Sequence, residues 1–86
     1  MNIHATRRTS DGTRVLYTEH RLLRGRPWRV TVGTIGEDWC QDDEGRMCYG
    51  YFWKDLNGDC GRTFYRLRDC KADFSRELAD RNGAAQ

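Results

Sequence analysis

Alternation of apolar and polar residues is the clearest pattern in the first half of the chain. A period of two puts every second side chain on one face of an extended strand, so the pattern predicts strands at 13–18 and 26–32. Pro27 must sit at the start of the second strand or on an edge, because proline cannot donate to the hydrogen-bond ladder. The apolar positions of this alternation are Val15, Tyr17, Trp28, Val30 and Val32.

The densest aromatic run, 47–54, precedes a turn at 55–59 and a run at 61–68 in which apolar and basic residues alternate. Aromatic residues suit a pleated, half-buried surface, and Asn57-Gly58 between two such runs is a strong hairpin signal. These stretches predict one β-hairpin over 47–68, the element around which the rest of the chain is organised.

The length of the hairpin loop decides which side chains share a face, because a slip of one residue exchanges the faces. A three-residue loop, 57–59, is favoured over a two-residue turn. The tighter turn would set Arg62 and Arg66 among the core rings, and a buried guanidinium without a partner is costly. The favoured register predicts a core face of Tyr49, Tyr51, Trp53, Thr63, Tyr65 and Leu67. It predicts an opposite, cationic face of Phe52, Phe64, Lys54, Arg62, Arg66 and Arg68.

The segments between and after these strands are less regular. The stretch 33–39 either continues the second strand after a glycine bulge or forms a short third strand, and 40–46 is an acidic turn. Within 69–80, Phe74 and Leu78 lie four residues apart, which indicates one or two turns of helix packed on the sheet.

These elements predict one small domain at 13–80, between a flexible N-terminal arm at 1–12 and a mobile C-terminal tail at 81–86. Several short strands with closely spaced turns are typical of a small, strongly bent antiparallel sheet or barrel. The predicted fold class is therefore mainly β, with a short C-terminal helical turn.

Composition adds two constraints. The mean hydropathy is −0.93, yet 12% of the 86 residues are aromatic, which is too many for a disordered chain. The net charge of +2 excludes a uniformly basic binder, but the charges are segregated: carboxylates gather at 37–44, and arginines dominate 7–29 and 62–68. Arginine favours planar, bidentate contacts with phosphate or carboxylate and stacking on rings, although it can equally be the chain's preferred surface cation.

No apolar run is long enough to span a bilayer and no signal-peptide core follows Met1, so we expect a cytoplasmic protein without a membrane partner. The four cysteines, Cys40, Cys48, Cys60 and Cys70, form two disulfides only in an oxidising compartment. In a reducing one they are thiols, and buried structural thiols are the favoured interpretation.

Metal binding and catalysis find little support. The spacing of the cysteines lacks the close ligand pairs of structural zinc sites. The stretch 55–59 resembles the start of a calcium loop, but Cys60 and Arg66 occupy the places that need glycine and glutamate. His4 and His20 lie in an arm and a charged connection, so no base is evident for a cysteine nucleophile. We therefore expect no cofactor, no metal and no enzymatic activity.

The cationic face is the best functional candidate. Single-stranded nucleic acid is commonly held by rings that stack on bases beside cations that contact phosphates. Arg26 and Arg29 would help if the second strand lies adjacent. Alternatively, both phenylalanines complete the core and the arginines cover their edges. The predicted site for nucleic acid or a nucleotide-like ligand comprises Arg62, Arg66, Arg68, Phe52, Phe64, Lys54 and Arg29.

The order of these pieces, from about 15 to 73, resembles the WYL domain, a small β-barrel of the Src-homology-three type found in bacterial and phage regulators. The resemblance rests on the strands at 15–18 and 26–32, on the aromatic strand at 49–53, and above all on Arg62-Thr63-Phe64 with Arg66-Leu67-Arg68 behind it. The family's Trp-Tyr-Leu run is absent. The resemblance implies a regulatory module that senses a ligand or contacts nucleic acid, here acting on a partner without a helix-turn-helix segment.

A second hypothesis belongs to a different class of function. The acidic turn Asp42-Asp43-Glu44 can mimic phosphate towards a basic protein, and exposed edge strands are templates for pairing, including homodimerisation. On this interpretation the protein is an interaction module, or a phage-encoded inhibitor that docks on a host nucleic-acid enzyme or regulator.

Overall fold

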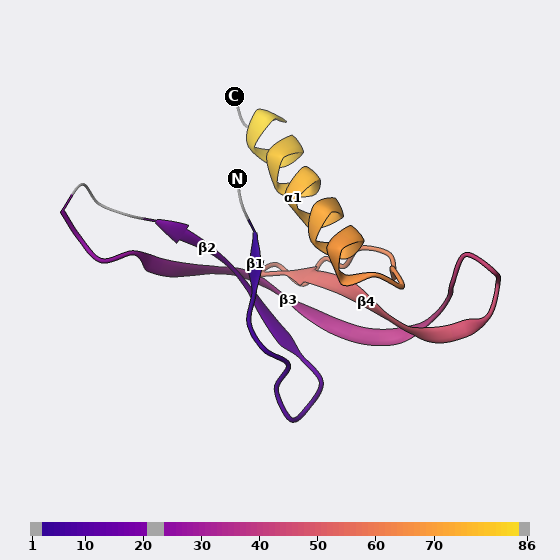
Figure 1. Ribbon diagram of the computed structural model, residues 1–86. Coiled ribbons are helices and arrows are strands. Elements are labelled where there is room, and N and C mark those ends of the chain that lie inside the picture. Colours follow the sequence, from indigo (N-terminus) through magenta and orange to yellow (C-terminus); the bar gives the residue numbers. More distant parts are fainter. Residues whose placement is uncertain (1–2, 21–23, 85–86) are drawn as a thin grey trace.

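The computed structural model describes residues 3–20 and 24–84 as an antiparallel sheet with one helix lying across one of its faces (Figure 1). The elements are β1 (His4–Ala5), β2 (Arg14–His20), β3 (Trp28–Gln41), β4 (Met47–Asp55) and α1 (Leu67–Ala84). The strand order is β1-β2-β3-β4. The prediction of a mainly β fold with a bent antiparallel sheet is confirmed, and the sheet is open rather than closed into a barrel.

The strands predicted from alternation are present, and β3 runs on through Gly33 to Gln41. Of the two interpretations of 33–39, continuation after a bulge is the correct one. Leu16 lies opposite Gly33 while Tyr17 lies opposite Thr31, so Val32 is the extra residue of a bulge in β3. A side chain at Gly33 would collide with the backbone of β4 and with α1, so glycine here lets the helix lie close to the sheet.

The core lies between α1 and the middle of the sheet. Trp53 of β4 packs against Phe74 of α1 with ring centroids 5.1 Å apart, and its indole N–H donates to Asp73 at 2.8 Å. Burying a large apolar side chain contributes roughly 1.5–3 kcal/mol, so each large member of this cluster stabilises the fold appreciably. Its buried members are Ile3, Leu16, Ile35, Trp53, Cys70 and Phe74.

The second half of the predicted hairpin is wrong, because 61–68 does not form a strand. Only isolated bridges join it to β4, and Tyr51 lies opposite Phe64, not opposite Tyr65 as the three-residue loop requires. The backbone N–H of Tyr51 donates to Phe64 O at 2.6 Å, and the N–H of Phe64 donates to Tyr51 O at 2.8 Å. β4 pairs along its whole length with β3 instead.

This register changes the predicted faces. Trp53 is buried, and Tyr51 and Leu67 pack against the core as predicted. Tyr49, however, is 60% exposed, and Phe64 packs against the core instead of lying on the outer face.

The C-terminal helix is much longer than the predicted one or two turns. α1 has 18 residues, carries Asp69 in its first turn and Arg81 in its last, and so complements the helix dipole at both ends. Its core-facing residues are Leu67, Cys70, Phe74 and Leu78. Spacings of three and four residues place these side chains on one face, which explains why a helix forms where the sequence indicated the end of a strand.

Both predicted tails contribute to the fold where they are described. β1 pairs with β2 and the neighbouring Ile3 is buried, so 3–12 is not simply an arm; His4 stacks on Tyr17 with centroids 5.4 Å apart. The predicted tail at 81–86 begins inside α1, and its last two residues lie outside the described part.

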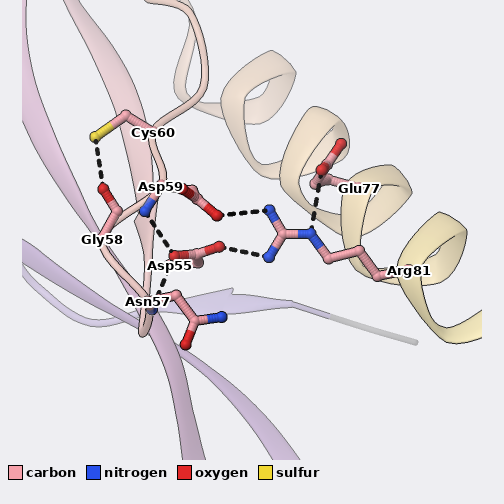
Figure 2. A network of polar contacts seen from close by, with 7 residues as sticks. All are labelled: Asp55, Asn57, Gly58, Asp59, Cys60, Glu77 and Arg81. Carbon is pink, nitrogen blue, oxygen red and sulfur yellow. Dashed lines mark hydrogen bonds and ion pairs between the residues drawn. The ribbon is translucent and has the colours of Figure 1, made fainter. Parts of the chain in front are cut away.

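A polar network fastens the turn after β4 to the end of α1 (Figure 2). The Asp55 carboxylate accepts hydrogen bonds from the backbone N–H groups of Asn57 and Asp59, both at 2.9 Å. The Arg81 guanidinium contacts Asp55 and also reaches Glu77 at 3.2 Å and Asp59 at 3.8 Å. The hydrogen bond from Arg81 holds the pKa of Asp55 below its usual value. The carboxylates that resemble calcium ligands in the sequence therefore face a guanidinium.

Candidate nucleic-acid interface

The structure does not bring the predicted site residues together. Phe52 lies directly opposite Gly36, against which its ring packs. The neighbouring residue Trp53 points under α1, so Phe52 points to the other face of the sheet. Phe64 packs on the helix side. The two rings that were expected to share a cationic face are therefore on opposite sides of the sheet.

Three of the predicted arginines lie beside partners within the protein. The Arg66 guanidinium is 3.6 Å from the Asp43 carboxylate and lies over the Tyr65 ring at 4.7 Å. Arg68 is 3.9 Å from Asp69. The guanidinium of Arg62 covers the Phe64 ring at 4.5 Å, as the alternative interpretation expected.

Some of the predicted site residues line two open hollows on the surface. Arg62 and Phe64 line one of about 510 Å³ together with Asp69, Asp73 and Arg76. Phe52 lines another, of about 750 Å³, on the side of the β1–β2 loop, where Arg8 pairs with Glu37 at 3.0 Å. In both hollows the cations face carboxylates of the same chain. Lys54 is exposed on β4, in neither hollow.

Arg29 has a different environment, at the end of the sheet formed by β2 and β3. Its guanidinium lies over the Tyr17 ring at 4.4 Å. The next residue of β3, Trp28, projects from the other face of the sheet. It lies directly opposite His20, and the two rings stack with centroids 5.7 Å apart and planes 23° from parallel. The indole of Trp28 is 43% exposed.

We call this region the basic end and define it as Tyr17, His20, Arg24, Arg26, Trp28 and Arg29. All but Tyr17 are exposed. Within the described residues, the three arginines form no ion pair with a carboxylate, although Glu19 lies opposite Arg29 in the sheet. These guanidinium groups can therefore bind an external anion without breaking an ion pair with a described carboxylate.

The length of the sheet explains why the basic end is exposed. The strands β2 and β3 extend past the region that α1 covers (Figure 1). Of the predicted apolar face Trp28, Val30 and Val32, only Val32 packs against the core, and Val30 is 40% exposed. The alternation predicted the strand correctly but not the burial of its outer half.

The opposite end of the sheet carries a second aromatic stack and the opposite charge. Trp39 and Tyr49 lie directly opposite each other on β3 and β4, with ring centroids 4.1 Å apart, and are 55% and 60% exposed. We call this region the acidic end: Asp38, Trp39, Asp42, Asp43, Glu44 and Tyr49. The Tyr65 hydroxyl donates to Asp43 at 2.6 Å, and this hydrogen bond raises the pKa of Tyr65.

The charge difference between the two ends is already present in the sequence. Residues 19–31 contain four arginines and one glutamate, and 37–46 contain five carboxylates and one arginine. The described residues of these segments lie at opposite ends of the sheet in a molecule whose longest dimension is 49 Å (Figure 1). The site predicted from the sequence contains Arg29, with Arg26 beside it, but not Trp28, His20 or Arg24, although the local excess of arginine is visible in the sequence.

Comparisons with family models, curated proteins and solved structures found no match to this chain, so the likeness to the WYL domain stays a prediction. Across the described residues, no helix has the length and apolar character needed to cross a bilayer. The same residues contain no group of three or more His, Cys, Asp or Glu side chains arranged to hold a metal ion.

Proposed function

We propose that the protein is a non-enzymatic, cytoplasmic regulatory module that binds single-stranded nucleic acid through its basic end. The observation that carries this proposal is the exposed ring of Trp28 at the end of the sheet whose arginines have no carboxylate partner among the described residues. Trp28 and Arg29 are neighbours in β3 and project from opposite faces, so a strand that contacts both must cross the end of the sheet. Aromatic rings stack on unpaired bases, and neighbouring cations contact the phosphates.

The arrangement favours a single strand over a duplex. Stacking on Trp28 needs the face of a base, which duplex pairing and stacking hide. Arginine has a planar fork that matches two phosphate oxygens at once, and Arg24, Arg26 and Arg29 are spaced along one short segment. If each contacts one phosphate, the logarithm of the binding constant should fall with the logarithm of the salt concentration with a slope of about −2.

The acidic end contributes to the orientation of the complex. Its carboxylates repel a phosphate backbone, so the strand should approach the opposite end of the sheet. A regulatory role, which the resemblance to WYL domains implies, would follow from occupying a strand that another protein needs.

Fluorescence anisotropy of a labelled single-stranded oligonucleotide tests the proposal with matched variants. The double substitution Arg26→Ala/Arg29→Ala should weaken binding and flatten the salt slope by roughly 1–2 units. The matched control Arg62→Ala/Arg66→Ala removes the same charge from the hairpin predicted by the sequence. It should weaken binding only slightly, through the lower net charge of the protein. If the control pair weakens binding as much as the Arg26/Arg29 pair, the basic end is not the site.

A second function, docking on a basic protein, is favoured by the acidic end. Trp39, Tyr49 and Met47 are each more than half exposed and stand beside the acidic turn at 42–44. Aromatic residues and methionine are enriched in interfaces, and carboxylates around them select a basic partner. A nuclease-treated pull-down that depends on Trp39 and not on Trp28 would favour this function over the first.

A further inference from the structure

Two of the four cysteines meet at the acidic end. Cys40 of β3 and Cys48 of β4 are directly opposite in the antiparallel register, and their Sγ atoms are 3.8 Å apart. Both residues are half-buried, in contrast to the fully buried Cys70. This pair is adjacent to the Trp39–Tyr49 stack.

The register suits a covalent bond between the two sulfurs. Directly opposed residues in an antiparallel sheet have Cα atoms about 4.5–5.5 Å apart. Disulfides span Cα distances of about 4.4–6.8 Å, and their sulfurs are about 2.05 Å apart. Rotation of the two side chains can therefore close the pair while the strands keep their positions.

The structure also leaves room for the Cys40 sulfur. A side chain at Gly50 would collide with this sulfur and with the carbonyl of Phe64. Glycine at this place thus allows a thiol on β3 and the backbone of the 61–66 segment to share one small space beside β4.

The other two cysteines have different surroundings. Cys70 is fully buried under α1, and this burial raises the pKa of its thiol to about 12. Cys60 is exposed in the turn after β4, where its sulfur lies 3.7 Å from the carbonyl oxygen of Gly58 (Figure 2). The expectation of buried structural thiols therefore fits Cys70 alone. Among the described residues, only Cys40 and Cys48 lie close enough for a thiol to meet a thiol.

We propose that Cys40 and Cys48 form a thiol–disulfide exchange site that closes into a cross-strand disulfide at the expense of a small-molecule disulfide such as oxidised glutathione. One cysteine thiolate attacks a sulfur of the small disulfide, and the released glutathione thiolate takes up a proton. The second cysteine, as its thiolate, then attacks the protein-bound sulfur of the mixed disulfide and expels the second glutathione. Two protein thiols are oxidised by two electrons, and one glutathione disulfide is reduced to two thiols.

The surroundings of the two cysteines make thiol–disulfide exchange slow. Burial and the neighbouring Cys48 raise the pKa of the Cys40 thiol, and the carboxylates of Asp42 and Asp38 act in the same direction. The thiolate is the attacking species, so the reaction needs mildly alkaline buffer or long incubation. Closure would link β3 to β4 one residue away from the aromatic stack and fix the acidic end.

The test uses the whole protein incubated with oxidised glutathione, blocked with iodoacetamide and digested with trypsin. Arg46 lies between the two cysteines, so cleavage after it leaves Cys40 and Cys48 on separate peptides that only a disulfide can hold together. We expect to find these two peptides linked by a disulfide. Iodoacetamide should then alkylate only two of the four cysteines, because Cys40 and Cys48 no longer have free thiols. The Cys60→Ser variant should form the same link, and the Cys40→Ser variant should stop at a glutathione adduct on Cys48.

Three results would overturn the proposal. Glutathione adducts on Cys40 or Cys48 that never resolve would show that the sulfurs cannot meet. Linked dimers would show that exchange occurs between molecules. Equally fast closure in concentrated urea would show that short sequence separation, and not the register of β3 and β4, brings the thiols together.

Discussion

The two ends of the sheet are built alike and charged oppositely. Each is a pair of strands that extends past α1 and carries two stacked rings at directly opposed positions, Trp28 with His20 and Trp39 with Tyr49. Arginines are the neighbours of the first stack along the chain, and carboxylates are the neighbours of the second. The comparison teaches that exposed rings supply contact area at both ends, while charge decides which partner can use it.

The ends also differ in how far their charges are used inside the molecule. At the acidic end, Asp43 accepts the Tyr65 hydroxyl and pairs with Arg66. At the basic end, the arginines have no carboxylate partner among the described residues, and the Arg29 guanidinium lies over the face of Tyr17. One end is fastened to the loop before α1, whereas the other presents its charges to solvent.

The largest effect on stability is expected for a substitution in the core, which lies between the two ends of the sheet and supports both. Phe74→Ala removes the buried ring under Trp53 and should lower the free energy of unfolding by about 3–5 kcal/mol, measured by urea denaturation. Phe52→Ala, on the uncovered face of the sheet, is the matched control and should cost clearly less. A larger loss for Phe52→Ala would mean that the core is on the other face.

The comparison of the two stacks is tested by single substitutions in each. Trp28→Ala should weaken binding of a single-stranded oligonucleotide by about 1–3 kcal/mol, the usual contribution of one base stacked on one ring. Trp39→Ala removes an even more exposed indole, 55% against 43%, from the acidic end and should leave the affinity almost unchanged. Fluorescence anisotropy gives both values, and equal losses would contradict the assignment to one end.

A pH titration tests the network that anchors α1 to the turn after β4. Because the hydrogen bond from Arg81 lowers the pKa of Asp55, this carboxylate stabilises the fold above its unfolded pKa of about 3.9 and loses that effect as pH falls through its folded pKa. Asp55→Asn should therefore be less stable than the wild type at neutral pH, with the gap in thermal midpoint closing in acid. A gap that is independent of pH would contradict this account.

The smallest effect is expected for the hydrogen bond between Tyr65 and Asp43 at the acidic end. The carboxylate of Asp43 raises the pKa of Tyr65 by accepting its hydroxyl hydrogen. Asp43→Asn removes the negative charge and should bring the pKa of this tyrosine down towards its ordinary value of about 10, measured by ultraviolet absorbance. Asp42→Asn is the neighbouring control and should leave the titration of Tyr65 in place.

Sequence periodicity predicted the parts of the fold that depend on local pattern. The strands at 13–18, 26–32 and 47–54 were found because alternation and aromatic content are properties of neighbouring residues. The run at 61–68 alternates in the same way, but its apolar Leu67 also begins the helical stripe of Cys70, Phe74 and Leu78. Packing of that stripe on the sheet decided between strand and helix, and no window of a few residues contains this information.

The candidate site was predicted less well, for a physical reason. The charge of an arginine can be read from the sequence, but the carboxylate that neutralises it depends on the fold: Arg66 meets Asp43, more than twenty residues away. The faces of Phe52 and Phe64 depended on a register that a slip of one residue reverses. Arg29 lies in the part of β3 that pairs with β2, whereas β4 pairs with β3 from Gly33 to Gln41, so its place in the site stays a prediction.

In the proposed function, the basic end alone carries the nucleic-acid contact. The most direct measurement is the salt dependence of oligonucleotide binding for two charge-reversal variants, Arg26→Glu/Arg29→Glu at the basic end and Asp42→Lys/Glu44→Lys at the acidic end. The account predicts that the first variant loses binding even at low salt, and that the second keeps the wild-type slope of about −2. An unchanged affinity in the first variant, or a steeper slope in the second, would contradict it.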